Sequence, residues 1–250
     1  MKWLIPFLIA CSLCCQAEER QSGNFFLSPD LRQLGFEKGA NPIEIWIDIG
    51  QVLWRDSSNG KSCESCHGAM SNLKDAVRSL PQISRDGTRL ENLEDKILFY
   101  LNASREKKLT LDSDEVVALS VAIQQNAKDS VIQMQPQLQS QRVWNEQLKA
   151  GTDLFYQRMG RMNLSCSQCH DQNIGKNLRA DVISPAYPTG FPVYRMAWQK
   201  PGTMDGRLRA CYFGVQAKVP DVGDAELRQL ELFLKVRAQG MVLDGPSLRR

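Results

Sequence analysis

Two segments of the chain carry apolar residues at helical spacing just before a cysteine-rich motif. In the first, Ile45, Ile49, Val52 and Leu53 recur in the order expected of a helix. The second, residues 146–155, shares with the first a glycine three residues before a leucine–aromatic pair. The pattern therefore predicts the same sequence of elements twice, a helix followed by a loop and then the motif.

Each half of the chain also ends in a predicted helix. In the first half, Ser113 and Asp114 can cap a largely apolar stretch, residues 116–123. In the second half Asp224 can cap a helix that Gly240 then stops. The apolar positions of this last helix fall on one face; they are Leu227, Leu230, Phe233 and Leu234. This repeated order predicts a mostly α protein of two halves related by internal duplication.

The segments between these helices set the predicted domain boundaries. Residues 18–41 mix glycine, proline and asparagine, which favours an extended N-terminal arm. Residues 127–141 are rich in glutamine and serine and indicate a linker, so we expect domains over 42–135 and 136–250. Four prolines and two glycines between residues 185 and 202 exclude a single regular helix there and indicate an irregular segment.

The overall composition is that of a soluble globular protein. The 250 residues are 42% hydrophobic and 24% charged, with a formal net charge of +3. This charge is too small to indicate a nucleic-acid partner, and no basic stretch is interleaved with aromatic residues. We therefore expect no nucleic acid among the partners.

The first 17 residues read as an export signal. Lys2 precedes an apolar stretch, Trp3–Ala10, and Ala17 is a small residue suited to cleavage. The stretch is too short to span a bilayer, and no other long apolar run follows. The alternatives are a lipoprotein signal, because Leu8–Cys11 resembles a lipid-attachment box, or a retained apolar N-terminus. We expect residues 1–17 to be a signal peptide and the mature protein to have no membrane span.

Two copies of Cys-x-x-Cys-His stand at residues 63–67 and 166–170. This motif is the attachment signature of c-type haem, whose vinyl groups bond to the two thiols while the histidine ligates the iron. A zinc site would need further ligands, and a thioredoxin-like pair would need a βαβ context. The motifs predict two covalently bound haem c groups and a periplasmic location. The cofactor-binding residues are Cys63, Cys66, Cys166 and Cys169, and the iron-ligating histidines are His67 and His170.

One cysteine of the predicted mature chain is left over. Of eight cysteines, Cys11, Cys14 and Cys15 fall in the predicted signal and four in the motifs, which leaves Cys211. The chain has two histidines, both in the motifs, so neither haem can have two histidine ligands from this chain. A sixth ligand from the protein must therefore be methionine, cysteine, tyrosine, lysine or another group.

The surroundings of Cys211 are cationic. Between Lys176 and Lys218 the chain has seven basic and two acidic residues, with Arg207 and Arg209 closest to Cys211 in sequence. Positive charge lowers the pKa of a thiol and favours the reactive thiolate. It also attracts small anions. The alternative is a buried structural cysteine that packs as a small hydrophobic residue.

These residues together resemble the SoxA family. The resemblance is carried by the two motifs, by Phe191-Pro-Val-Tyr-Arg195 and Trp198-Gln199, and by Arg207-x-Arg209-x-Cys211. SoxA is the dihaem subunit of the bacterial SoxAX complex of thiosulfate oxidation. The resemblance covers nearly the whole mature chain and implies two cytochrome c-type domains with one haem each.

The resemblance also implies an activity, partners and residue roles. The activity is that of an L-cysteine S-thiosulfotransferase, the oxidative joining of thiosulfate to a cysteine of a SoxYZ-like carrier protein. The implied partners are a SoxX-like monohaem subunit in a heterodimer and a small electron-accepting cytochrome c. By the same resemblance Cys211 is both the active-site cysteine, often found as a persulfide, and the sixth ligand of the second haem. Arg207 matches the active-site arginine.

One departure from the family concerns the first haem. The family usually supplies a cysteine ligand after a segment like Leu93–Ile97, whereas here Tyr100 and Asn102 occupy that region. The sixth ligand could be Tyr100, Met70 or Met134, or the site could be open. Two other functions stay open at this point, a dihaem thiosulfate dehydrogenase that forms tetrathionate and a plain electron-transfer cytochrome.

Overall fold

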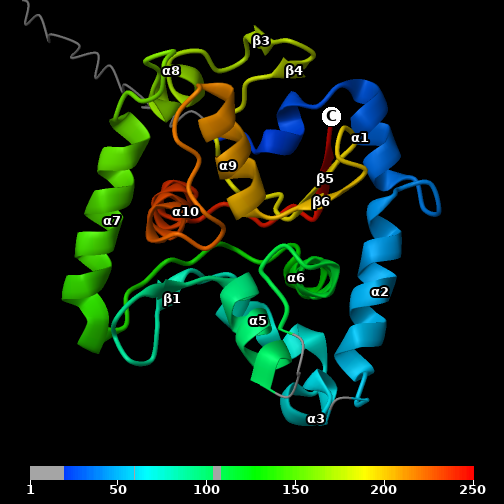
Figure 1. Ribbon diagram of the computed structural model, residues 1–250. Coiled ribbons are helices and arrows are strands. Elements are labelled where there is room, and N and C mark those ends of the chain that lie inside the picture. The colour runs from blue at the N-terminus through cyan, green and yellow to red at the C-terminus, as the bar shows by residue number, and fades with distance from the viewer. Residues whose placement is uncertain (1–19, 59, 104–107) are drawn as a thin grey trace, which may run out of the picture.

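The computed structural model describes residues 20–58, 60–103 and 108–250, and most of its regular structure is helical (Figure 1). The prediction of a mostly α fold is confirmed. The predicted signal peptide, residues 1–17, lies outside the described residues. The elements up to the end of the first predicted domain are η1 (Gly23–Phe26), α1 (Pro29–Phe36), α2 (Ile43–Arg55), α3 (Cys63–His67), η2 (Met70–Leu73), α4 (Lys74–Val77), β1 (Gln82–Ile83), β2 (Leu90–Glu91), α5 (Leu93–Ala103) and α6 (Asp114–Ala127).

The second half has the same class of structure with more strands. Its helices of more than ten residues are α7, α9 and α10; the second motif, α8, lies at the top of the view with β3 and β4, and β5 and β6 lie beside α9 (Figure 1). None of the helices within the described ranges is both long and apolar enough to cross a membrane. The elements are η3 (Leu138–Ser140), α7 (Gln141–Tyr156), α8 (Cys166–His170), β3 (Asn177–Leu178), β4 (Asp181–Val182), β5 (Val193–Arg195), β6 (Lys200–Gly202), α9 (Met204–Gly214), α10 (Ala225–Arg237) and β7 (Ser247–Arg249).

The two halves pack their long helices in the same way. Helix α2 packs against α6, and α7 packs against α10. A Cβ atom on Gly50 would lie 2.2 Å from the carbonyl oxygen of Ala118, and one on Gly151 would lie 2.0 Å from that of Gln229. Only glycine allows backbones to approach so closely. The glycine that recurs in the sequence therefore marks equivalent helix crossings, which supports the predicted relation between the halves.

The apolar pattern located helix α2 but did not identify its buried side. Ile45, Ile49 and Val52 are 64%, 43% and 69% exposed. The buried residues of this helix are Ile43, Gly50 and Trp54. The helix is apolar on more than one side, so periodicity alone does not show which side packs against α6.

The last helix of each half begins where the sequence indicates. Helix α6 follows Ser113 and α10 follows Asp224. The side chains of these two residues do not cap their own helices but accept hydrogen bonds from upstream backbone N–H groups, Ser113 Oγ from Thr110 at 2.9 Å and Asp224 Oδ2 from Asp221 at 2.7 Å. The predicted caps thus stabilise the turn that leads into each helix.

The N-terminal arm differs from the extended form that was expected. From residue 20 it contains η1 and α1, and Pro29 in the first turn of α1 suits a helix start. Arg20 donates to the carbonyl of Arg237 at 2.8 Å, and Asn24 accepts from Arg249 at 2.8 Å. Contacts with the C-terminal part of the chain hold this segment in place, and a reading of local sequence does not reveal them.

The irregular segment expected over residues 185–202 is confirmed as non-helical, and part of it forms a sheet. Strand β5 lies between β6 and β7 and pairs antiparallel with β6 and parallel with β7. Arg195 of β5 is level with Lys200 on one side and with Arg249 on the other. Strand β7, near the C-terminal end of the chain, is therefore paired with the segment that precedes Cys211.

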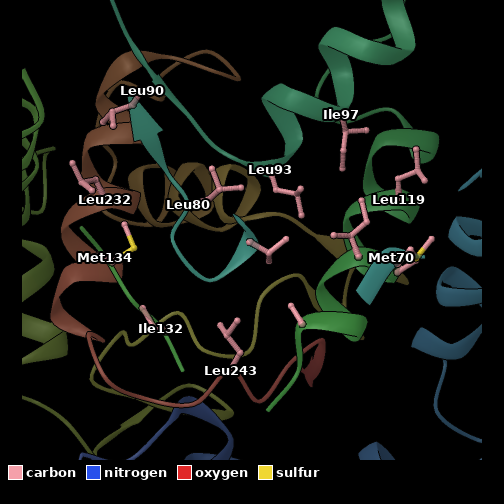
Figure 2. Packing of buried hydrophobic residues seen from close by; sticks show 14 of the residues in the cluster. Met70, Leu80, Leu90, Leu93, Ile97, Leu119, Ile132, Met134, Leu232 and Leu243 are labelled. Atoms are coloured by element: carbon pink, nitrogen blue, oxygen red, sulfur yellow. The ribbon is translucent and has the colours of Figure 1, made fainter. Parts of the chain in front are cut away.

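The largest hydrophobic core draws on both halves of the chain. Figure 2 shows Leu93 and Leu119 from the first half in one cluster with Leu232 and Leu243 from the second. Ile132, just before the predicted boundary at residue 135, is fully buried in this cluster. The segment between the predicted domains is thus part of the packed interior.

A buried ionic network also joins the halves. The Arg228 side chain on α10 is 3% exposed, and its Nε and Nη2 atoms lie 2.5 and 2.8 Å from the carboxylate oxygens of Asp95 on α5. Its Nη1 atom pairs with Asp205 on α9. Buried charges are costly unless they are paired, so Arg228 holds helices of both halves in a fixed relation.

Candidate haem and thiol site

Each Cys-x-x-Cys-His motif forms a short helix, α3 or α8, and these lie at opposite ends of the view in Figure 1. A serine precedes each helix, and Ser62 Oγ accepts from the N–H of Ser65 at 3.1 Å while Ser165 Oγ accepts from that of Gln168 at 3.3 Å. Helical spacing places the first cysteine on the same side as the second cysteine and the histidine. All five cysteines within the described ranges are free thiols, so both motifs fit covalent haem attachment.

The histidine of the second motif is oriented for iron binding. His170 Nδ1 lies 2.6 Å from the carbonyl oxygen of Ser184. A carbonyl oxygen only accepts, so Nδ1 carries the proton and Nε2 is left with its lone pair. Metal-ligating histidines usually have such a partner on the other ring nitrogen, which fixes the ring and its tautomer.

Cys211 lies on α9 and faces this histidine. Its half-buried side chain lies near the His170 ring, and because Nδ1 is occupied by the Ser184 carbonyl, Nε2 is the ring nitrogen left free. Burial raises the pKa of the Cys211 thiol, but the charge of Arg207, the contact with His170 and the charge of Arg195 lower it to about 7 overall. By contrast, burial raises the pKa of Cys166 to about 12. Cys211 is therefore the thiol whose surroundings favour the thiolate.

The structure brings two of the three candidate arginines to Cys211. Arg207 precedes Cys211 by one helical turn on α9, and the charge of Arg195 on β5 also acts on the Cys211 thiol. Arg209 lies on another side of the helix, where its Nε donates to the carbonyl of Pro220 at 2.9 Å. Of the residues near Cys211 in sequence, Arg207 is thus the one placed beside the thiol, and Arg195 joins it through the fold.

The first motif has a different neighbour. The ring centres of Tyr100 on α5 and His67 are 6.0 Å apart, and the two rings are nearly perpendicular. Tyr100 is 63% exposed. Met70 and Met134 are buried in the core (Figure 2), and Met70 Sδ accepts from Asn126 Nδ2 at 3.5 Å. The structure therefore brings Tyr100 beside His67 and uses both methionines in packing.

Two groups of the second site carried no signal in the sequence. The carbonyl of Ser184 is a backbone group, so its residue type does not reveal its contact with His170. Arg249 is distant from Cys211 in sequence, and the parallel pairing of β5 with β7 brings it level with Arg195. Strand pairing between distant segments would have been needed to find it.

Comparisons with known proteins identify the family of the chain. The family model described as "SoxA/TsdA, cytochrome c domain" matches residues 49–132. L-cysteine S-thiosulfotransferase subunit SoxA of Chlorobaculum thiosulfatiphilum is 32% identical over 213 residues, 84% of this chain and 72% of that protein. The corresponding protein of Pseudaminobacter salicylatoxidans is 29% identical over 239 residues, 93% of this chain and 82% of the relative. The crystal structure of SoxXA from P. pantotrophus matches with a TM-score of 0.83 and 25% identity, covering 92% of this chain and 87% of that one. The chain therefore belongs to the SoxA family.

Proposed function

We propose that this chain is the dihaem subunit of an L-cysteine S-thiosulfotransferase that joins thiosulfate to a cysteine of a SoxYZ-like carrier protein. The observation that carries the proposal is the position of Cys211. It is the only cysteine outside the haem motifs after the predicted signal peptide, and it lies against His170 beside Arg207 and Arg195. The relatives that bear this activity in their names support the same conclusion.

Each predicted domain, 42–135 and 136–250, would hold one haem c. Cys63 and Cys66 would attach the first haem with His67 as iron ligand. The second haem would be attached by Cys166 and Cys169 and ligated by His170 and Cys211. With residues 1–17 as signal peptide, the mature protein would act in the periplasm.

Cys211 and thiosulfate supply the two sulfur atoms of the new bond. The Cys211 thiolate and the outer sulfur of thiosulfate form an S–S bond, and two electrons leave to give Cys211–S–S–SO₃⁻. The carrier thiolate then attacks the sulfur between Cys211 and the sulfonate, and the Cys211 thiolate leaves. When bound, the haem groups supply the acceptor for the two electrons, which a SoxX-like monohaem subunit and a small cytochrome c carry away.

Arg207 would bind the anionic end of thiosulfate. Its guanidinium can form paired, charge-assisted hydrogen bonds with two sulfonate oxygens. Its place one turn before Cys211 would set the outer sulfur against the thiolate. The same positive charge favours the thiolate of Cys211 before the substrate arrives.

The partner subunit follows from the family. The solved relative is a SoxXA complex, and this chain matches 87% of its SoxA-like chain at a TM-score of 0.83. We infer a heterodimer with a SoxX-like monohaem cytochrome, which would take electrons from this chain.

Intact mass spectrometry tests the function directly. The haem-loaded heterodimer is exposed to thiosulfate and an oxidised small cytochrome c, with or without the reduced carrier protein. We expect a thiosulfate adduct on Cys211 without carrier and its transfer to the carrier cysteine when carrier is present. The Cys211→Ser variant, which keeps both haem motifs, should form neither adduct. Tetrathionate without any protein adduct would instead indicate a thiosulfate dehydrogenase, and absence of both products would indicate a plain electron-transfer cytochrome.

A further inference from the structure

Three basic residues lie side by side across the small sheet next to Cys211. Arg195 on β5 is level with Lys200 on β6 and with Arg249 on β7. Residues level with each other on neighbouring strands project to the same face, and like charges in such positions destabilise a sheet unless something compensates them. Lys200 is exposed and its charge acts on Asp112, so the uncompensated charge is that of the two arginines.

The carboxylates near Arg195 and Arg249 do not satisfy them. The Arg195 side chain is 13% exposed, and its Nη2 atom is 3.9 Å from Asp181, which is long for an ion pair. The Nε atom of Arg195 is buried and lacks a hydrogen-bond partner among the residues that the structure describes. The Nη1 atom of Arg249 bonds to neutral oxygens only, those of Asn24, Ser247 and Leu248. A half-buried guanidinium with donors left over can take an anion as a further partner.

Arg195 is held in one orientation by the segment that follows it. Its guanidinium carbon lies 5.4 Å from the centre of the Trp198 ring, a cation–π contact. The Trp198 ring packs onto Gly202, where a Cβ atom would lie 2.4 Å from the ring. Packing against Gly202 of β6 therefore holds the Trp198 ring in place, and the cation–π contact with this ring orients the Arg195 guanidinium.

The charges of the three arginines act on one another, and those of Arg207 and Arg195 also act on the thiol of Cys211. Burial and then the charge of Arg207 lower the pKa of Arg195, against the effect of Asp181. Burial lowers the pKa of Arg249 to about 10, and Arg207 and Arg195 add to this while Asp244 opposes it. The Arg195 charge in turn lowers the pKa of Cys211. Positive charge from β5 and α9 thus acts on Cys211, and Arg249 on β7 adds to the charge around Arg195.

We propose that Arg195 binds the sulfonate oxygens of thiosulfate together with Arg207, and that Arg249 supports Arg195 from the adjacent strand. This proposal rests on the proposed function and names the residues that select its substrate. A sulfonate has three oxygens, and one guanidinium fork can bind two of them. The Nη groups of Arg195, whose Nη2 atom is 3.9 Å from the Asp181 carboxylate, supply a donor for the third. The site would accept a small tetrahedral sulfur oxyanion, and the outer sulfur of thiosulfate would be left for Cys211.

Steady-state kinetics of an Arg195→Gln heterodimer provide the test, with sulfate as a competing dianion that lacks the outer sulfur. We expect KM for thiosulfate to rise about tenfold or more, as the loss of one charge-assisted hydrogen bond predicts, with a smaller change in kcat. Inhibition by sulfate should weaken by a similar factor. Arg195→Lys keeps the charge but loses the planar guanidinium fork. Its KM for thiosulfate should lie between those of the unmodified protein and Arg195→Gln.

Arg209→Gln is the matched control, because it removes the same charge two residues from Cys211 on another side of α9. It should leave KM and sulfate inhibition within about twofold of the unmodified protein, since its guanidinium binds the Pro220 carbonyl and its charge acts on Asp112. Equal effects of Arg195→Gln and Arg209→Gln would overturn the proposal, because they would show only a general loss of charge. An unchanged KM and unchanged sulfate inhibition in Arg195→Gln would overturn it as well.

Calorimetric binding of sulfate to the Cys211→Ser heterodimer separates this proposal from the proposed function. The measurement needs no turnover, and we expect Arg195→Gln to weaken this binding in the Cys211→Ser background. Sulfate binding that does not depend on Arg195 rejects the anion site alone. Turnover by the Cys211→Ser protein rejects the proposed function and leaves the anion site to be judged by the binding data.

Discussion

Gly50 and Gly151 hold equivalent places in the two halves of the molecule. Each lets the helix before a Cys-x-x-Cys-His motif approach the last helix of its half very closely. A Cβ atom at either position would lie only 2.0–2.2 Å from a backbone carbonyl oxygen of that helix. Beyond the motifs the halves diverge. In the first, helix α5 brings Tyr100 beside His67, and in the second, helix α9 brings Cys211 beside His170. The helix pair and the motif thus attach the haem, and the segment inserted between motif and last helix decides what faces the histidine.

The inserted segments also differ in how they are held. In the first half the strands β1 and β2 form an isolated hairpin before α5. In the second half β5 and β6 join the C-terminal strand β7, and Asp205 at the start of α9 pairs with Arg228. Arg228 on α10 ties both inserts, through Asp95 on α5 and Asp205 on α9, but the second is held in addition by the C-terminal strand, as a site with fixed reacting groups requires.

The largest expected effect comes from cutting the ionic link between the halves. Arg228→Ala leaves the buried Asp205 and the partly buried Asp95 without their partner, and we expect a loss of about 3–5 kcal/mol in the free energy of unfolding. Chemical denaturation of the haem-loaded protein measures it. Arg142→Ala, which removes an exposed pair with Glu146, should change stability by less than about 1 kcal/mol. A loss from Arg228→Ala no larger than that of the control would show that the halves are independent.

The next effect separates the two halves by activity. Arg207→Ala should cost about 2–4 kcal/mol of transition-state stabilisation, comparable to the loss of an oxyanion-hole donor. Both haems should stay attached, because neither motif contains the residue. The ratio kcat/KM for thiosulfate gives the measurement, and absorbance at the haem bands checks the cofactor content. Unchanged kinetics would place the anion away from α9.

A smaller and equal effect should follow from filling the two helix crossings. Gly50→Ala and Gly151→Ala each push a methyl group into a backbone carbonyl that cannot move aside, so each should destabilise the fold by about 1–3 kcal/mol. Gly35→Ala is the control, because its position in α1 is open and alanine suits a helix. Strongly unequal effects at Gly50 and Gly151 would contradict the equivalence of the two crossings.

The sequence predicts the parts of this fold that depend on neighbouring residues. The two motifs, the helices around Gly50 and Gly151, and the starts of α6 and α10 all follow from local spacing. The row of Arg195, Lys200 and Arg249 could not be predicted, because it depends on the register of strands far apart in the chain. The side of α2 that packs inward was also beyond the sequence, since apolar residues occur on more than one side.

The candidate site divides in the same way. Cys211 followed from counting cysteines, and Arg207 from its spacing to Cys211. The effect of Arg195 on the thiol depends instead on how the chain folds from β5 through β6 to α9. The position of Tyr100 next to His67 depends on how α5 packs over the first motif. Functional residues that lie close together in sequence could therefore be predicted. Residues that come next to them only through the tertiary fold could not.

Low-temperature EPR of the oxidised, haem-loaded chain tests the central claim, that a thiol faces the histidine in the second half only. Thiolate-ligated low-spin haem gives a distinct signal, so the account predicts one such signal per chain. It should disappear in Cys211→Ser, while the signal of the first haem stays unchanged because His67 and Tyr100 lie near the other motif. Two thiolate signals from this chain alone, or one that survives in Cys211→Ser, would contradict the account.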